Sequence, residues 1–281
     1  MKVGIIGAGR VGKCLAFQLN AADMLIGLTA STESDNKLLA MNFHKPCMTN
    51  AKLWEAADVL LICVPDRLIG SVAAEIALQV KPEHKVVLHV SGSMGLEPLA
   101  PLEKLGAHVG SLHPLQSFTD SFTRLKGVYM AIDGDNEAQQ VARKLVKLFG
   151  GKPFSVPAAE RGAYHAAACF CSNYAVALEA LAAQLMARWT GSEESAWEAL
   201  WPLFLGTAEN LDSARKPGEA LTGPIARGDV PTVAKHLAEL PKEFLPVYCS
   251  LGLVTTKLAL TNGTIDKKTA DELKRLLTAA V

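Results

Sequence analysis

A glycine-rich turn near the start of the chain constrains the fold more than any other feature. Its residues are Gly7, Ala8, Gly9, Arg10, Val11 and Gly12, between an apolar run over residues 3–6 and a helical pattern over residues 11–20. Between a strand and a helix, such glycines allow a tight turn, let a pyrophosphate approach the backbone and let the helix pack on the strand. Unpaired N–H groups at the helix start attract the anion. The turn therefore predicts a dinucleotide site at these six residues; the alternative is a glycine turn without a ligand.

The rest of the first half alternates short apolar runs with helical patterns. The runs cover residues 3–6, 24–29, 59–64, 86–90 and 108–111, and the helical patterns cover residues 11–20, 68–79 and 136–149. This alternation predicts buried parallel strands in a doubly wound sheet. After about residue 155 helices are expected over residues 159–188, 193–205, 230–239, 241–261 and 266–279. The predicted fold class is α/β, with a doubly wound domain over residues 1–155 followed by an all-α domain over residues 156–281.

The residues after the second apolar run bear on the choice of nicotinamide cofactor. An acid at the tip of this strand would bind the ribose 2′-hydroxyl of NAD and repel the 2′-phosphate of NADP. The chain instead has Thr29, Ser31 and Thr32 there, and its first acid, Glu33, comes later. With Arg10 able to reach the adenosine end, this pattern favours NADP(H), and NAD(H) is the alternative. Arg10 could equally be an exposed arginine at a helix start.

The turn after the third apolar run contains Val64, Pro65 and Asp66. It lies at the carboxyl edge of the predicted sheet, where open α/β folds bind ligands. We therefore expect these residues to line the nicotinamide ribose. For Asp66, a role as the N-cap of the next helix is the alternative.

The next two apolar runs deliver polar side chains to the same edge. Ser91 and Ser93 follow one run, and His113, Gln116 and Ser117 follow the other. An imidazole near its ordinary pKa can exchange a proton with a substrate. We therefore expect His113 and Ser91 to be catalytic and the other three to bind substrate. A structural or surface role is the alternative for His113.

Polar residues also interrupt the apolar helical half. His165 and Asn173 are eight residues apart, which places them nearly on one face of a helix. Buried polar groups need partners, so a catalytic role in a cleft and a helix–helix hydrogen-bond network are both open. In the loop over residues 221–229, Arg227 could clamp a substrate carboxylate or pair with Asp229 and brace the loop.

Charge and composition exclude several classes of protein. Lys+Arg and Asp+Glu both number 28, so the net charge is zero, and no basic block marks a nucleic-acid surface. No uninterrupted apolar run reaches the roughly 18–20 residues of a membrane span, and the N-terminus lacks a signal core. Cys169 and Cys171 are too close in sequence for the usual zinc spacing. We expect a soluble, cytoplasmic protein with reduced thiols and without a metal, nucleic-acid or membrane partner.

Several strings of the chain resemble those of one family: GIIGAGRVG, ICVPD, HVSGS, GSLHPLQSF and GPIARGD. They look like those of Rossmann-like oxidoreductases that carry a helical C-terminal domain of unknown function. That family belongs with 6-phosphogluconate dehydrogenase-like, β-hydroxyacid dehydrogenase-like and pyrroline-carboxylate reductase-like folds. The resemblance covers nearly the whole chain. It implies a Rossmann domain and an NADP cofactor, and it names no substrate.

A more distant resemblance is to prephenate dehydrogenases, which have a Ser after one strand, a Gly-x-His-Pro element and a helical His-x₇-His segment. Ser91 or Ser93, then His113, then His165 with Asn173 come in the matching order. By this likeness His113 would bind the substrate oxygen that becomes, or came from, a carbonyl. Asn173 stands where the second helical His would be, which puts prephenate itself in doubt.

The leading hypothesis is therefore an oxidoreductase that moves a hydride between NADP(H) and a small polar, acidic carbonyl, imine or hydroxy compound. The alternative is a non-catalytic dinucleotide-sensing or interaction protein with the same fold. The catalytic Lys of β-hydroxyacid dehydrogenases has no counterpart, since Tyr164 and His165 lie near its place; this favours the alternative. The apolar stretches over residues 166–187 and 245–260 exceed what five helices would bury alone, so we expect a homodimer.

Overall fold

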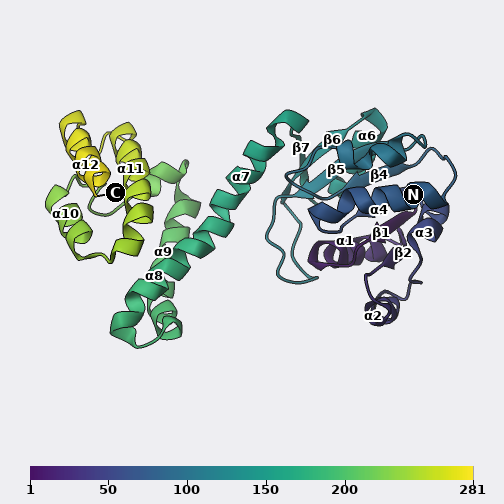
Figure 1. Ribbon diagram of the computed structural model, residues 1–281, viewed down its shortest axis with the longest axis horizontal. Coiled ribbons are helices and arrows are strands. Elements are labelled where there is room, and N and C mark those ends of the chain that lie inside the picture. The colour runs from purple at the N-terminus through teal and green to yellow at the C-terminus, as the bar shows by residue number, and fades with distance from the viewer. Residues whose placement is uncertain (281) are drawn as a thin grey trace. The chain divides into compact units, whose positions relative to one another are not determined.

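The computed structural model describes residues 1–280 of the 281-residue chain. Its contacts divide the chain into two compact units, Met1–Tyr174 and Ala175–Val281. The first unit holds the whole sheet, and the second is helical (Figure 1). The predicted fold class, an α/β domain followed by an all-α region, is confirmed. The contacts group the first helix after residue 155 with the sheet, and domain limits at 155/156 stay a prediction.

The sheet has seven strands in the order β2-β1-β3-β4-β5-β6-β7. Five strands are parallel and coincide with the five apolar runs: β1 (Val3–Ile6), β2 (Leu25–Thr29), β3 (Val59–Ile62), β4 (Val86–His89) and β5 (His108–Pro114). The strand order reverses direction between β1 and β3. The carboxyl ends of these two strands therefore form the crevice in which doubly wound sheets bind ligands.

Two further strands extend the sheet beyond the prediction. β6 (Tyr129–Gly134) pairs antiparallel with β5, and β7 (Lys152–Ser155) pairs parallel with β6. β6 overlaps a short apolar run over residues 128–132 that was not interpreted as a strand, and β7 is a short edge strand with three exposed residues. The antiparallel pairing matters for the site, since it sets Asp133 opposite Ser111 and Ala131 opposite His113.

Helices cover both faces of the sheet, as the doubly wound prediction requires. One buried cluster joins β-strand residues to α1 (Arg10–Ala21) and α6 (Asn136–Leu148), and a second joins them to α3 (Asn50–Ala56), α4 (Asp66–Gln79) and α5 (Ala100–Glu103). Apolar residues on one side of α6, such as Val141 and Leu145, are buried, while charged residues face outward. α2 (Glu33–Phe43), α3 and α5 were not expected from the sequence.

The long helix expected over residues 159–188 is divided. α7 (Arg161–Cys171) and α8 (Asn173–Thr190) meet at Ser172, whose φ of −117° and ψ of −69° interrupt the helix. The prediction of one uninterrupted helix was therefore wrong at this residue. The split places Asn173 at the start of α8, whereas His165 lies within α7.

The second unit has its own small core. α9 (Glu193–Ser213) runs past the predicted end at residue 205, whereas α10 (Val230–Glu239), α11 (Leu245–Thr261) and α12 (Lys267–Ala279) lie close to the predicted positions. Residues of α10, α11 and α12 form one buried cluster. Asp266 accepts the Thr269 N–H at 2.8 Å and caps α12, as the sequence predicted.

Two helical stretches have the length and mean hydropathy of a membrane span. They are Ala158–Thr190, with 6% of its apolar window buried, and Lys242–Thr261, with 22% buried. Length and composition alone are weak evidence for a membrane, because core helices of other proteins have both. The expectation of a chain that does not span a membrane stays a prediction.

Candidate functional site

A cavity of about 810 Å³ lies at the carboxyl ends of β1, β2 and β3. Seven of the twelve residues predicted to bind a dinucleotide line it: Gly7, Ala8, Gly9, Thr29, Ser31, Val64 and Pro65. It also takes in residues that the sequence did not single out, among them Lys13, Asp35, Asn50 and Cys63. Its position at the strand-order reversal is where this class of sheet binds nucleotides.

The glycine turn has the backbone geometry that its sequence predicted. Gly7 has a φ of +95°, which a residue with a side chain rarely adopts. A Cβ on Gly12 would collide with the carbonyl oxygen of Gly7. Gly12 therefore lets α1 pack against the end of β1, while Gly9 lines the cavity at the helix start.

The N-terminus of α1 offers free N–H groups to an anion. Gly9 caps this helix without a side-chain hydrogen bond, and the first turn contains no acid. The unpaired N–H groups and the helix dipole together favour a phosphate there. Arg10, the first residue of α1, and the following Val11 are not among the residues that line the cavity; Arg10 is exposed.

The end of the cavity near β2 contains hydroxyl groups and one carboxylate. Thr32 caps α2, accepting the Asp35 N–H at 3.1 Å and donating to Asp35 Oδ2 at 2.6 Å. Asp35 and Ser31 both line the cavity. The carboxylate of Asp35 therefore lies in the cavity, three residues after Thr32. It was missed because an acid was sought only at the tip of the strand.

Ser91 and Ser93, in the loop after β4, both bind Asp66 at the start of α4. Their Oγ atoms donate to Asp66 Oδ2 at 2.7 Å and 3.0 Å. Ser91 Oγ also accepts the N–H groups of Ser93 and Met94. The Ser91 hydroxyl is therefore already engaged by its own loop and by Asp66, whereas Ser93 is exposed. The catalytic role expected of Ser91 stays a prediction.

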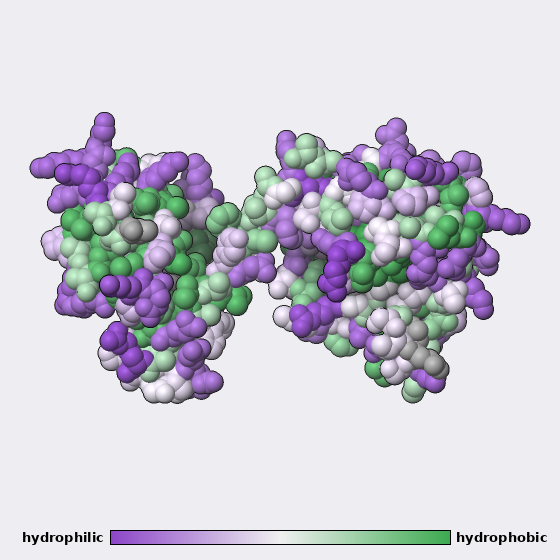
Figure 2. Space-filling model, viewed as in Figure 1, coloured by the Kyte–Doolittle hydropathy of each residue, from purple (hydrophilic) through white to green (hydrophobic). Residues whose placement is uncertain are grey.

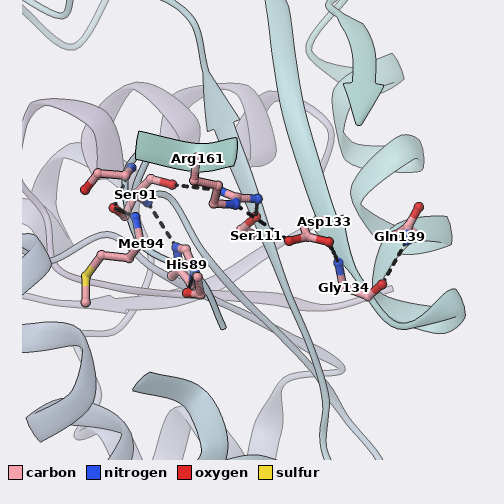
Figure 3. A network of polar contacts seen from close by, with 10 residues as sticks. His89, Ser91, Met94, Ser111, Asp133, Gly134, Gln139 and Arg161 are labelled. Atoms are coloured by element: carbon pink, nitrogen blue, oxygen red, sulfur yellow. Dashed lines mark hydrogen bonds and ion pairs between the residues drawn. The ribbon is translucent and has the colours of Figure 1, made fainter. Parts of the chain in front are cut away.

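A buried arginine holds the ends of β4, β5 and β6 together (Figure 3). Arg161, at the start of α7, is 1% exposed and donates to the Ser91 carbonyl oxygen at 3.3 Å and to Ser111 Oγ. Its Nε lies 3.6 Å from Asp133 Oδ2. One cation thus links the strand ends that carry the predicted site, and the sequence analysis did not identify it.

Three rings come together above these strand ends. His113 Nδ1 lies 2.6 Å from the Tyr164 hydroxyl, and its ring centroid is 6.0 Å from that of His165. A Cβ on Gly92 would lie 2.7 Å from His113 Nε2 and 2.8 Å from His165 Nδ1. His165 Nδ1 is buried and has no hydrogen-bond partner among the described residues. The predicted residues His113 and His165 are therefore neighbours, with Tyr164 as an unpredicted third member.

The electrostatics of this cluster differ from the expectation. Burial, together with the charges of His165 and Arg161, lowers the pKa of His113 to about 4. Burial likewise lowers the pKa of His89 to about 4 and raises the pKa of Tyr164 to about 12. The prediction that His113 titrates near its ordinary pKa was therefore wrong: at neutral pH its imidazole and the Tyr164 phenol are uncharged.

Four other predicted residues, Gln116, Ser117, Asn173 and Arg227, are not part of the cluster of His113, Tyr164 and His165. Gln116 Oε1 accepts the N–H of Ser117, and both residues are exposed after β5. Asn173 is exposed at the start of α8. Arg227 is exposed in the second unit, where Asp229 caps α10 through the Thr232 N–H. Their predicted roles in substrate binding and catalysis stay predictions.

Arg161 and Tyr164, the two residues that were missed from the sequence, share one helical face with the predicted His165. Arg161, Tyr164 and His165 lie at spacings of three and four on α7, so all three point the same way. A search for polar residues at these spacings in an apolar helix would have found them. The eight-residue spacing used instead crosses the break at Ser172.

Solved structures with the same fold include a Thermotoga maritima protein, 25% identical, with a TM-score of 0.74 over 92% of this chain and 99% of that one. A Bacteroides fragilis protein described as a proposed NADP oxidoreductase is 22% identical, with a TM-score of 0.72 over 92% of this chain and 97% of that one. The D-apionate oxidoisomerase of Cupriavidus necator is 32% identical over 82 residues, 29% of this chain and 30% of the relative.

The residues of the candidate site fall within two family matches. Residues 1–114, which include the glycine turn and His113, match the family described as a Rossmann-like domain. Residues 128–255, which include Asp133, Arg161 and Tyr164, match the family described as a domain of unknown function, DUF2520. The chain thus joins a Rossmann-like domain to a DUF2520 domain.

Proposed function

We propose that the chain binds NADP(H) and is an oxidoreductase acting on a small polar carbonyl, imine or hydroxy compound. The observation that carries this proposal is the shared sheet edge. The cavity with the glycine turn and the cluster of His113, Tyr164 and His165 both lie at the carboxyl ends of the parallel strands. The likeness of fold to a protein described as an NADP oxidoreductase supports it.

The residues of the cavity fit the cofactor. The free N–H groups at the start of α1 would hold the pyrophosphate. In this proposal Ser31 and Arg10 bind the 2′-phosphate of the cofactor. Val64 and Pro65 line the nicotinamide ribose. When bound, the cofactor supplies the hydride, and the protein supplies orientation and electrostatics.

At the reacting end, the chain offers uncharged hydrogen-bonding groups. His113 and Tyr164 are neutral at neutral pH, since burial disfavours their charged forms. Such groups can hold a carbonyl or imine and stabilise the charge that develops on it. Arg161 is buried and engaged with Ser91, Ser111 and Asp133, so it would position the strand ends rather than touch the substrate. Binding of a substrate carboxylate by Arg227 is a separate proposal that rests on the sequence of its own loop.

Two measurements test this function. Calorimetric titration with NADPH and NADH should give tighter binding of NADPH. Incubation with NADPH and a panel of oxo acids, ketones and imines should then consume NADPH absorbance with at least one class. Absence of binding by either cofactor would refute the function. Binding without turnover on any class would favour the dinucleotide-sensing alternative.

We also propose that the chain forms a homodimer through its helical half. Large apolar side chains are exposed there, and Figure 2 shows hydrophobic residues gathered on the helical unit. They include Val176, Trp189, Trp201, Leu203, Leu211 and Val254. Exposed apolar patches of this kind mark interfaces, and two-fold dimers are the commonest closed assembly. Light scattering should give twice 29.9 kDa; a mass of 29.9 kDa at micromolar concentration would contradict the dimer.

A further inference from the structure

The contact between His113 and Tyr164 carries an inference about how the proposed site works. We propose that the Tyr164 hydroxyl donates to His113 Nδ1 and so fixes the tautomer in which Nε2–H faces the substrate. His113 then acts as a neutral hydrogen-bond donor, and Tyr164 is its positioning residue. This inference rests on the proposed function for its chemical role, whereas the tautomer itself is a property of the protein alone.

The direction of the hydrogen bond follows from the chemistry of the two groups. Tyr164 Oη and His113 Nδ1 are 2.6 Å apart, a short distance for an O–H···N contact. Both groups are neutral, so the proton on the bond belongs either to the phenol or to Nδ1. A phenol is the stronger donor and an imidazole nitrogen the stronger acceptor. The phenol therefore donates, and the single proton of the neutral ring lies on Nε2.

The charged groups around His113 keep it in this neutral form. Burial acts together with His165, Arg161 and His89, which disfavour a positive charge on the ring. Asp66 is the group that favours the charge, and two serine hydroxyls already bind it. Neutral His113 is the outcome, with its pKa lowered to about 4.

Close neighbours also restrict the position of His113 Nε2. Gly92 and His113 Nε2 approach so closely that a Cβ would not fit between them, and the Tyr164 and His113 rings meet edge to face at 87°. The imidazole is thus fixed on two sides. Among the described residues, the hydrogen bond of the ring is the one between Nδ1 and Tyr164, so in this proposal Nε2–H is left to bind a carbonyl oxygen or an imine nitrogen.

A neutral imidazole donor suits reduction of a carbonyl. Negative charge develops on the substrate oxygen, and a preorganised N–H gains strength as that charge appears. His113 does not need to become imidazolium, as the general-acid role expected from the sequence would require. With the opposite tautomer, Nε2 would be a bare acceptor and would repel the same oxygen.

The tautomer can be read by NMR before any substrate is known. Long-range ¹H–¹⁵N spectra of uniformly labelled protein, assigned with His113→Gln, distinguish a protonated Nε2 from a protonated Nδ1. We expect protonated Nε2 in the wild type and a mixture of tautomers in Tyr164→Phe. Protonated Nδ1 in the wild type would overturn the proposal, even if the variant failed to fold.

The chain contains a matched control for this experiment. His236 Nδ1 and Tyr248 Oη are 2.8 Å apart in the second unit, with rings edge to face at 85°. Tyr248→Phe removes the same kind of bond elsewhere. It should change the spectrum of His236 and leave that of His113 unchanged; a change at His113 would contradict the assignment.

Kinetics separates this inference from the proposed function. With a substrate from the screen, Tyr164→Phe should lower kcat at least about tenfold, the equivalent of one hydrogen bond of about 1.4 kcal/mol, while NADPH affinity is unchanged. An unchanged kcat would overturn the role of the tautomer. If the wild-type protein did not bind NADPH, the proposed function would be refuted instead. The tautomer of His113 found by NMR would still hold.

Discussion

A Cβ atom built on Gly92 would lie 2.7 Å from Nε2 of His113 and 2.8 Å from Nδ1 of His165. The loop after β4 therefore sets the positions of both imidazoles. Gly92→Ala should push His113 from its contact with Tyr164, lower the free energy of unfolding by about 1–3 kcal/mol as overpacking does, and reduce turnover. NADPH affinity should not change, since the glycine turn lies at the end of a different strand. Denaturant unfolding and calorimetry measure both.

Gly70→Ala is the matched control. Gly70 is in α4, and a Cβ there would lie 3.7 Å or more from its neighbours. Alanine in this helix should raise the free energy of unfolding by about 0.5–1 kcal/mol. If Gly92→Ala raised the free energy of unfolding as Gly70→Ala does, Gly92 would not restrain His113 and His165.

Removal of the Arg161 side chain should destabilise the first unit strongly. Arg161→Leu leaves Asp133 without its cation and Ser111 without a partner, and breaking a buried ion pair costs about 3–5 kcal/mol. In Arg161→Leu/Asp133→Asn, part of this loss should return, because no unpaired carboxylate remains.

The exposed Arg143 on α6 offers a comparison for the same experiment. Arg143→Leu should change the free energy of unfolding by no more than about 0.5 kcal/mol. A loss for Arg161→Leu as small as this one would show that Arg161 does not hold the strand ends.

The parallel part of the fold was predictable because it rests on local patterns. Strands covered on both faces are continuously apolar, and Gly7 and Gly12 are required by a positive φ and by a close helix contact. The sequence also placed Ser91 and His113 at one edge, since the carboxyl ends of parallel strands share an edge, and it singled out His165 as a polar residue in an apolar helix. The structure brings these three residues to the Gly92 loop.

The residues that were missed depend on contacts far apart in sequence. Arg161 reaches Ser111 across 50 residues, and Tyr164 reaches His113 across 51. The spacing of polar residues on α7 could have singled out Arg161 and Tyr164, but no local pattern shows that they pair with Ser111 and His113. The lowered pKa of His113 could not be predicted either, since it results from burial that only the folded chain creates.

Asp35 should weaken the binding of a 2′-phosphate. Its carboxylate lines the cavity next to Thr32, whose hydroxyl donates to it. Asp35→Asn keeps an acceptor for Thr32 and removes the negative charge. Affinity for NADPH should rise about three- to tenfold, as expected for like charges several ångströms apart near water. Affinity for NADH, which has no 2′-phosphate, is the internal control in calorimetry and should change less. An equal change for both cofactors would place the carboxylate away from the adenosine end.

The stability of the protein should fall on mild acidification because of two histidines. His89 and His113 have pKa values lowered to about 4 by burial, against about 6.5 in the unfolded chain. Between pH 6.5 and pH 4 the unfolded state binds protons that the native state does not, so the free energy of unfolding decreases as the pH falls through this window. Each histidine should contribute a loss of about 2 kcal/mol between pH 7 and pH 5.

Urea unfolding at pH 7 and pH 5 measures this loss. In His89→Gln the difference between the two pH values should shrink by roughly the share of one histidine, about 2 kcal/mol. His84→Gln, in an exposed loop, is the matched control and should leave the difference unchanged. A wild-type protein equally stable at both pH values would mean that His89 and His113 are protonated as easily in the native chain as in the unfolded one. The neutral form of His113, on which its role as a hydrogen-bond donor depends, would then be refuted together with the pH dependence.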